Sequence, residues 1–127
     1  MTTVYDTGAL LAAEGSSARM WALHGRLLAD VAGPPVVPVA VLAQAWRGGP
    51  QAQLSRLLRG CVIHPDTEAL GRAAGAACAR TRTADVVDAL VVVTAKVLGA
   101  GLVVTSDPRD LELLADAVGA RFAIEAV

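Results

Sequence analysis

The stretch between residues 84 and 114 constrains the fold more than any other part of this sequence, because it joins a long apolar segment to a short one. Residues 85–98 contain Val91, Val92 and Val93, yet the segment is too long for a strand and ends at Gly99, so it predicts a buried helix. Residues 102–105 then predict a short buried strand, and residues 108–118 a further helix. An apolar strand between two helices is typical of a parallel sheet that is covered on both faces.

The same stretch carries four carboxylates in two pairs with a three-residue spacing: Asp85 and Asp88, then Asp107 and Asp110. Residues three apart on a helix share a face, so each pair points the same way. Two carboxylates about 4 Å apart repel by roughly 4 kcal/mol at an effective dielectric near 20. A protein that gathers such groups usually places a cation between them. Each acid taken singly is also explained as a helix N-cap or as a first-turn acid.

The rest of the chain repeats the alternation of strand and helix. Strands are expected at residues 2–5, 36–37, 61–64 and 121–124, and helices at residues 7–13, 18–31, 39–47, 51–59 and 66–80. No repeat or linker divides the sequence. We therefore expect a single domain over residues 1–127, of the α/β class, with a mostly parallel central sheet.

Composition narrows the class of protein. The chain has 127 residues, of which 54% are hydrophobic and 18% charged, and this excludes a disordered chain. Lys96 and Gly99 interrupt the longest apolar run, which excludes a membrane span. The net charge of −1 argues against a strong general attraction to nucleic acid and leaves room for a local basic patch.

The N-terminus and the cysteines indicate the compartment. The opening MTTVYD has no signal-peptide pattern. Cys61 and Cys78 lack the spacing of metal ligands and are expected to be small buried hydrophobes in a reducing environment. We expect a cytoplasmic protein.

A fifth acid, Asp6, ends the first expected strand. In parallel sheets, ligands collect at the carboxyl ends of the strands. Asp107 follows the strand at residues 102–105, and the helix that begins near Asp85 can face the same edge. Several acids at one edge favour a cation site over separate caps. Oxygen ligands without His or Cys select hard cations such as Mg²⁺ or Mn²⁺.

Four segments of the chain, in this order and spacing, resemble PIN-domain proteins, and the VapC-type toxins of toxin–antitoxin pairs in particular: VYDTGALLA, PVAVLAQAWR, ADVVDALVVVTA and LVVTSDPRDLELL. The resemblance covers essentially the whole chain. It implies a PIN-like three-layer α/β fold and a Mg²⁺- or Mn²⁺-dependent ribonuclease. By position it implies that Asp6, Asp88 and Asp107 are catalytic metal ligands and that Asp85 and Asp110 are auxiliary acids.

One position departs from the pattern of the family. The acid expected on the helix after the second strand is replaced by Gln44. A Gln carbonyl can coordinate a metal ion or bind its water, but it carries no negative charge. The expected result is an auxiliary ligand and weaker metal binding, or reliance on Asp85 or Asp110 for the missing charge. Without the resemblance, Gln44 is equally well explained as a polar residue on the solvent face of a helix.

The resemblance also implies a reaction and partners. The reaction is hydrolysis of an RNA phosphodiester bond, assisted by a metal ion and needing no Ser, Cys or His nucleophile. The candidate phosphate-binding side chains, which could equally be solvated helix ends, are Arg47, Arg80, Arg82 and Arg109. The expected partners are RNA, a cognate antitoxin and a second copy of the chain in a homodimer. The candidate surfaces for an antitoxin or a second copy are the apolar stripe of the helix at residues 18–31 and the paired helices around residues 46–58. Trp21 and Trp46 would fit such a role, although core packing is the commoner use of Trp.

A different class of function stays open beside the nuclease. A PIN fold that has lost efficient catalysis would act by binding RNA or protein, and Gln44 favours this alternative while the five acids weigh against it. Two other doubly wound classes are rejected. A response-regulator receiver would need an acid pair after the first strand, and a haloacid-dehalogenase-like phosphatase would need an Asp where Gly8 stands.

Overall fold

Five short strands form one parallel sheet in the computed structural model, which describes residues 1–127. The strands are β1 (Thr3–Tyr5), β2 (Val36–Pro38), β3 (Val62–His64), β4 (Leu102–Thr105) and β5 (Ala123–Ala126). Their order is β3-β2-β1-β4-β5, and every neighbouring pair is parallel. The order runs outward from β1 in both directions, so the chain connections reverse between β1 and β4. Open parallel sheets bind ligands at such a switch point, beyond the carboxyl ends of the strands.

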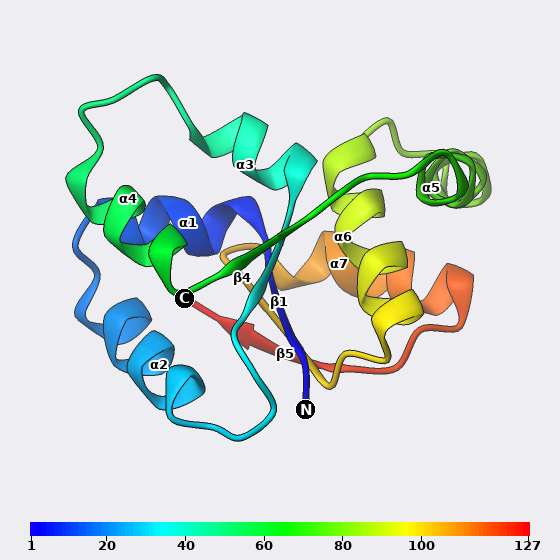
Figure 1. Ribbon diagram of the computed structural model, residues 1–127. Helices are drawn as coiled ribbons and strands as arrows, with labels where there is room; N and C mark the ends of the chain where they lie inside the picture. The colour runs from blue at the N-terminus through cyan, green and yellow to red at the C-terminus, as the bar shows by residue number, and fades with distance from the viewer.

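Seven helices cover the two faces of the sheet (Figure 1). They are α1 (Thr7–Glu14), α2 (Ala18–Leu28), α3 (Val39–Ala45), α4 (Ala52–Arg59), α5 (Glu68–Thr81), α6 (Val86–Leu98) and α7 (Pro108–Val118). Helix α1 contacts β4 and packs with α2, α3 and α4, whereas α6 contacts β1 and β2 and packs with α5 and α7. The predicted α/β fold, with a parallel sheet between helical layers, is therefore confirmed.

The apolar segment at residues 85–98 is a helix, as predicted, and it is the most buried one. All residues from 89 to 95 of α6 are buried, because the helix lies between the sheet on one side and α5 and α7 on the other. Gly99 ends it in the left-handed conformation (φ 62°), which glycine adopts without steric cost. A helix that is apolar on all sides is stable only in such a position. None of the seven helices combines the length and the apolar character that crossing a lipid bilayer demands.

Four elements had a predicted boundary that was wrong by two or three residues. Helix α5 begins at Glu68 rather than at residue 66, because Thr67 caps it. Helix α2 ends at Leu28 rather than at residue 31, because Val31 is fully exposed and gains nothing from continuing the helix. Helix α3 ends at Ala45, since Trp46 has an extended backbone (ψ 135°). The last strand is β5, two residues later than expected, because pairing with β4 sets its register.

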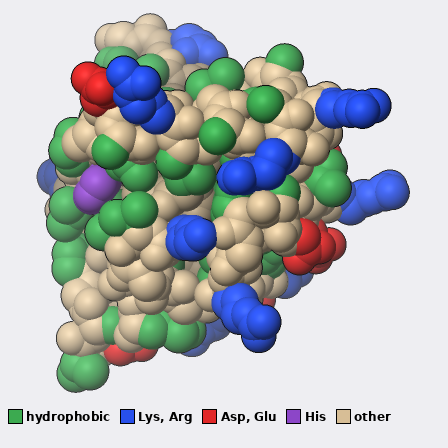
Figure 2. Space-filling view, turned by 90° about the vertical axis from the view of Figure 1, so that its right-hand side faces the viewer, with side chains coloured by type: hydrophobic (Ala, Val, Ile, Leu, Met, Phe, Trp, Pro, Cys, Tyr) green, Lys and Arg blue, Asp and Glu red, His purple; other side chains and the backbone are tan.

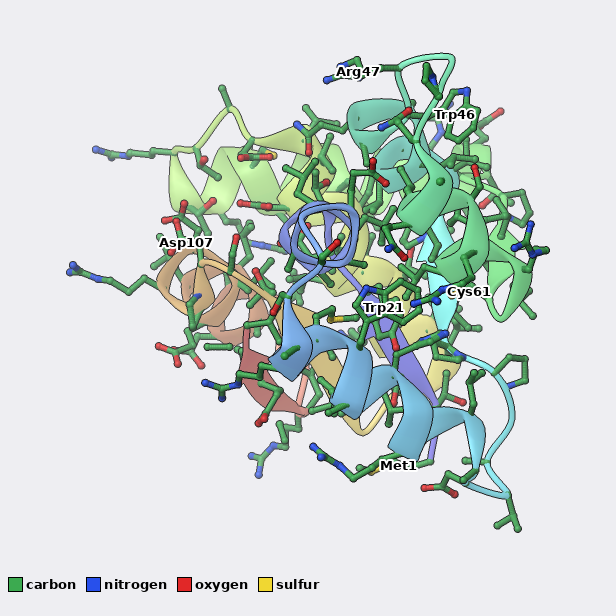
Figure 3. All side chains as sticks on the ribbon, turned by 90° about the vertical axis from the view of Figure 1, so that its left-hand side faces the viewer. Met1, Trp21, Trp46, Arg47, Cys61 and Asp107 are labelled. Atoms are coloured by element: carbon green, nitrogen blue, oxygen red, sulfur yellow. The ribbon has the colours of Figure 1, made fainter.

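The apolar stripe of α2, a candidate partner surface from the sequence, lies partly in the core, although Leu28 at its end is 48% exposed. Met20 and Leu23 are buried in the core. Trp21 donates its indole N–H to the Ala13 carbonyl at 3.0 Å, and the guanidinium of Arg56 lies 4.0 Å from the centre of its ring (Figure 3). This side of α2 therefore packs within the protein.

Candidate active site

A cleft of about 470 Å³ lies at the carboxyl edge of β1 and β4. It brings together the five acids that the sequence singled out: Asp6, Asp85, Asp88, Asp107 and Asp110. Its other lining residues are Thr7, Gly8, Leu11, Gln44, Ala45, Arg47, Gln51 and Ser106. The acids come from the ends of β1 and β4 and from the first turns of α6 and α7, so the site stands at the switch point of the sheet.

Asp6 occupies the floor of the cleft. Its backbone N–H donates to the Val104 carbonyl at 2.9 Å, which continues the pairing of β1 with β4. Its side chain is only 6% exposed and accepts two hydrogen bonds, from the Thr7 N–H at 2.7 Å and from the Thr105 hydroxyl at 2.8 Å. A carboxylate held by two donors has a fixed orientation. Burial nevertheless raises the pKa of Asp6 above its usual value, and the charges of Asp85 and Asp107 add to the rise.

Thr105 connects two of the acids. Its hydroxyl donates to Asp6 and accepts from the backbone N–H of Asp107 at 3.0 Å. Thr105 is fully buried. This single side chain therefore fixes the end of β1 relative to the start of α7.

The structure separates the acids that cap helices from those that do not. Asp85 caps α6, because its Oδ1 accepts the N–H of Asp88 at 3.0 Å. Asp107 occupies the N-cap position of α7, but its side chain makes no capping hydrogen bond. The carboxylate of Asp107 is therefore free to bind a ligand, whereas capping accounts for part of the role of Asp85.

Gly8 allows α1 to approach the end of β4. A Cβ atom at this position would clash with both the side chain and the backbone nitrogen of Ser106. The first turn of α1 and the segment after β4 consequently pack backbone to backbone. This contact brings Asp6 and Asp107 to the same cleft.

The acids of the cleft have no cationic partner. The two ion pairs of the protein join Arg19 to Glu125 and Arg72 to Glu68, and both lie on the surface. Burial raises the pKa of Asp88 to about 7, and the charges of Asp6, Asp85 and Asp110 contribute to the rise. The carboxylates therefore repel one another without compensation, as in a site that is built for a cation.

The donor chemistry of the cleft fits a hard divalent cation. The five acids offer oxygen atoms alone, the ligands that Mg²⁺ and Mn²⁺ prefer, and no Cys or His lines the cleft. The acids are not in a metal-coordinating arrangement in this structure: no group of three or more His, Cys, Asp or Glu residues is positioned to hold a metal ion.

Gln44, the position that departs from the family pattern, also lines the cleft. It is exposed on the last turns of α3, and its Oε1 accepts a hydrogen bond from the Thr7 hydroxyl at 2.6 Å. Thr7 follows Asp6 and is buried. The side chain of Gln44 is thus attached to the residue beside the central acid.

One of the four candidate phosphate-binding arginines lines the cleft. Arg47 follows α3, and its Nη1 donates to the Trp46 carbonyl at 2.8 Å (Figure 3). Gln51 holds the loop by accepting the N–H of Arg47 at 2.7 Å and donating to the Ala45 carbonyl at 3.0 Å. Arg47 is therefore anchored at the rim of the acidic cleft.

The other three arginines lie outside the cleft lining. Arg80 borders a separate groove between α5, α6 and α7, Arg82 caps the end of α5, and Arg109 lies in the first turn of α7. Figure 2 shows the side of the molecule that carries α5, where Lys and Arg side chains stand apart from one another. They form no continuous basic patch on that side.

Sequence reasoning found Gln44 but missed the other polar residues that support the site. Thr7 and Thr105 hold Asp6, Ser106 packs against Gly8, and Gln51 fixes the loop of Arg47. A signal was present, since Thr7 follows Asp6 directly and Thr105 ends a strand two residues before Asp107. The hydrogen bonds themselves depend on which strands are neighbours.

Comparison with known proteins supports the fold. No protein-family model matches the chain, and no curated protein matches it. Among solved structures, the chain is similar to a chain in the crystal structure of VapBC2 from Rickettsia felis bound to a DNA fragment from their promoter. The two are 13% identical, the match covers 100% of this chain and 99% of that one, and the TM-score is 0.75. The predicted PIN-like fold is thus confirmed: the whole chain folds as that chain of the VapBC2 structure does.

Proposed function

We propose that this protein is a metal-dependent endoribonuclease that hydrolyses RNA phosphodiester bonds in the acidic cleft and acts as the toxin of a toxin–antitoxin pair. The observation that carries the proposal is the convergence of five carboxylates, without a cationic partner, at the switch point of the sheet. The similarity of the fold to a chain of VapBC2 supports the toxin–antitoxin assignment and an antitoxin as protein partner.

The five acids of the cleft have two roles in this proposal. Asp6, Asp88 and Asp107 would hold Mg²⁺ or Mn²⁺, while Asp85 and Asp110 add negative charge beside them. Such an ion supplies Lewis-acid neutralisation of the phosphate charge and activates a water molecule for attack on phosphorus.

The uncharged and cationic residues prepare the site. The hydroxyl of Thr105 and the N–H of Thr7 orient the carboxylate of Asp6 before any ligand arrives. Arg47, at the rim, offers its guanidinium to a phosphate of the RNA.

Cleavage of a fluorogenic RNA tests the proposal. We expect the wild type to cleave only with added Mg²⁺ or Mn²⁺, and Asp6→Asn and Asp88→Asn each to lower kcat by at least about 100-fold, as expected when the charge that neutralises a transition state is removed. Asp116→Asn is the matched control, since Asp116 is exposed on α7 and outside the cleft. Metal-dependent cleavage that survives both changes would refute the assignment of the site.

A binding module is the second candidate function. Two observations favour it: Gln44 stands where the family pattern has an acid, and no three acids are positioned to hold a metal ion. It predicts RNA or protein binding without cleavage at any metal concentration, by a protein whose circular dichroism shows an intact fold. Cleavage that is lost in Asp6→Asn and kept in Asp116→Asn would exclude it.

The proposed partners can be tested separately. We expect a second copy of the chain to form a homodimer, which light scattering after size exclusion measures. We expect a small basic protein encoded next to this one to co-purify with it and to suppress cleavage. Absence of suppression by that neighbour would remove the toxin assignment while leaving the nuclease intact.

A further inference from the structure

The cleft has two chemically different walls. Asp85, Asp88, Asp107 and Asp110 come from α6 and α7, and Asp6 lies between these helices and α3 at the end of β1. The lining residues from α3 and the loop after it are Gln44, Ala45, Arg47 and Gln51. The α3 wall therefore contributes no carboxylate. It presents amide and guanidinium groups, which donate hydrogen bonds, toward a cleft whose other charged groups are acceptors.

The orientation of the Gln44 amide is fixed by its neighbour. Its Oε1 accepts the Thr7 hydroxyl at 2.6 Å, and Thr7 is itself fixed because its N–H donates to Asp6. A carboxamide is planar, so fixing the oxygen also fixes the direction of the Nε2 group. No residue of the protein accepts a hydrogen bond from that nitrogen, although the side chain lines the cleft. Gln44 thus holds two N–H donors ready for a ligand.

An amide nitrogen does not bind a hard cation, which takes oxygen ligands. It does donate to an anionic oxygen, and hydrogen bonds to charged acceptors are stronger than those between neutral groups. The phosphate oxygens of RNA are acceptors of this kind. A carboxylate at position 44 would instead repel them. Arg47, three residues later, lines the same wall and has the same preference.

We infer that Gln44 is a substrate-binding residue, which donates its side-chain amide to a phosphate oxygen of the RNA backbone, and that it is not a metal ligand. This inference rests on the proposed nuclease function of the same cleft. With Arg47 it makes the α3 wall the side that receives the RNA backbone, while the acids of α6, α7 and β1 hold the cation.

Two measurements on the Gln44→Ala variant distinguish a substrate-binding role of Gln44 from a metal-binding role. Calorimetric titration of the metal-free protein with Mn²⁺, without RNA, should give a Kd within about twofold of the wild type. Steady-state cleavage at saturating Mn²⁺ should show KM raised about tenfold, the size of one hydrogen bond to a charged group. The value of kcat should stay within about threefold, because the lost contact binds substrate in the ground state as well as in the transition state.

Three further variants test the geometry. Gln44→Glu keeps an acceptor for Thr7 but replaces the donors with a charge, so KM should rise at least as much as in Gln44→Ala while Mn²⁺ binds more tightly. Thr7→Val removes the hydroxyl that holds the Gln44 amide, so it should also raise KM. Thr7→Ser keeps this hydroxyl, so its KM should be close to that of the wild type.

The outcomes that overturn the inference are distinct. If Gln44→Ala weakens Mn²⁺ binding about tenfold or more, Gln44 is a metal ligand. If KM is unchanged in a variant that still binds Mn²⁺ and cleaves RNA, Gln44 does not contact the substrate, and the proposed function stands without it. If the wild type neither binds Mn²⁺ nor cleaves RNA, the proposed function fails, and this inference fails with it.

Discussion

The hydroxyl of Thr105 carries no charge, yet it determines where two charged groups lie. It donates to Asp6 in a hydrogen bond that is shielded from water, and it accepts from the backbone of Asp107 in one that is partly buried. Removing one partner of a buried hydrogen bond to a charged group costs more than the bond itself contributes, because the remaining group stays desolvated.

Thr105→Val should therefore lower the free energy of unfolding by about 1–3 kcal/mol, measured by urea denaturation. It should also reduce the rate of RNA cleavage, since Asp6 loses one of its two donors. Thr94→Val is the matched control, because the hydroxyl of Thr94 is equally buried but has no hydrogen-bond partner. The control should be neutral or stabilising by up to about 1 kcal/mol. Equal losses in the two variants would contradict the role given to Thr105.

At the scale of residues, the five acids of the cleft could be predicted from the sequence, but the residues that form hydrogen bonds to them could not. Carboxylates in an apolar stretch are conspicuous in the sequence, and all five lie in one cleft. The sequence treats Asp85 and Asp107 alike, as cap positions. Only the structure shows that Asp85 makes the capping hydrogen bond and Asp107 does not. That difference depends on the local backbone, and the partners of Asp6 depend on a strand about 100 residues away.

The contact between α1 and the end of β4 is the arrangement of elements on which the cleft depends most. Its tightest point is Gly8, where a Cβ atom would meet Ser106. Atoms added to a filled contact force the backbones apart. Such a shift would separate Asp6 from Asp107, which follow the two strands joined at this contact and line the same cleft.

Gly8→Ala should lower the free energy of unfolding by about 1–3 kcal/mol, the usual cost of overpacking, and should weaken Mn²⁺ binding. Gly25→Ala serves as control, because Gly25 lies inside α2 with no atom near the added methyl group. It should stabilise the protein by about 0.5–1 kcal/mol. Thermal and urea unfolding measure both. A neutral Gly8→Ala variant with normal Mn²⁺ affinity would show that the contact is looser than the structure indicates.

The elements could be predicted because their signals are local. The apolar run of α6, the terminal Gly99 and the alternation of strand and helix are all present in short windows of sequence. The predicted boundaries were wrong where tertiary contacts determine the end of a helix or strand. Helix α2 stops where its residues leave the core, and β5 begins where pairing with Leu102 places it. Strand order, which creates the switch point, has no local signal at all.

For the whole molecule, the uncompensated acids make stability depend on pH. The pKa of Asp88 is raised from 3.8 to about 7 in the folded protein. Between these values the folded state keeps a proton that the unfolded chain has released, so the free energy of unfolding falls as pH rises through this window. Asp6 acts in the same direction. His24 acts in the opposite direction, because its pKa is lowered by burial and by the charge of Arg56.

Comparison with Asp88→Asn isolates the contribution of Asp88. In EDTA, this variant should melt at a higher temperature than the wild type at pH 8, where Asp88 is ionised. The gain should shrink at pH 5.5, where the wild type is protonated. His24 is present in both proteins, so its effect cancels. Calorimetry at the two values of pH measures the difference, and an equal gain at both would show that Asp88 has an ordinary pKa.

The pairing of β1 with β4 has a consequence for the order in which this protein acquires its site during synthesis. Asp6 leaves the ribosome before its hydroxyl partner Thr105, which follows 99 residues later. A growing chain that ends before residue 102 has Asp6, Asp85 and Asp88. It lacks Thr105, Asp107 and Asp110. Chains are made from the N-terminus, and contacts between distant segments form late. The complete set of carboxylates therefore exists only after Asp110 has been made, so a product that ends before this residue has no complete site.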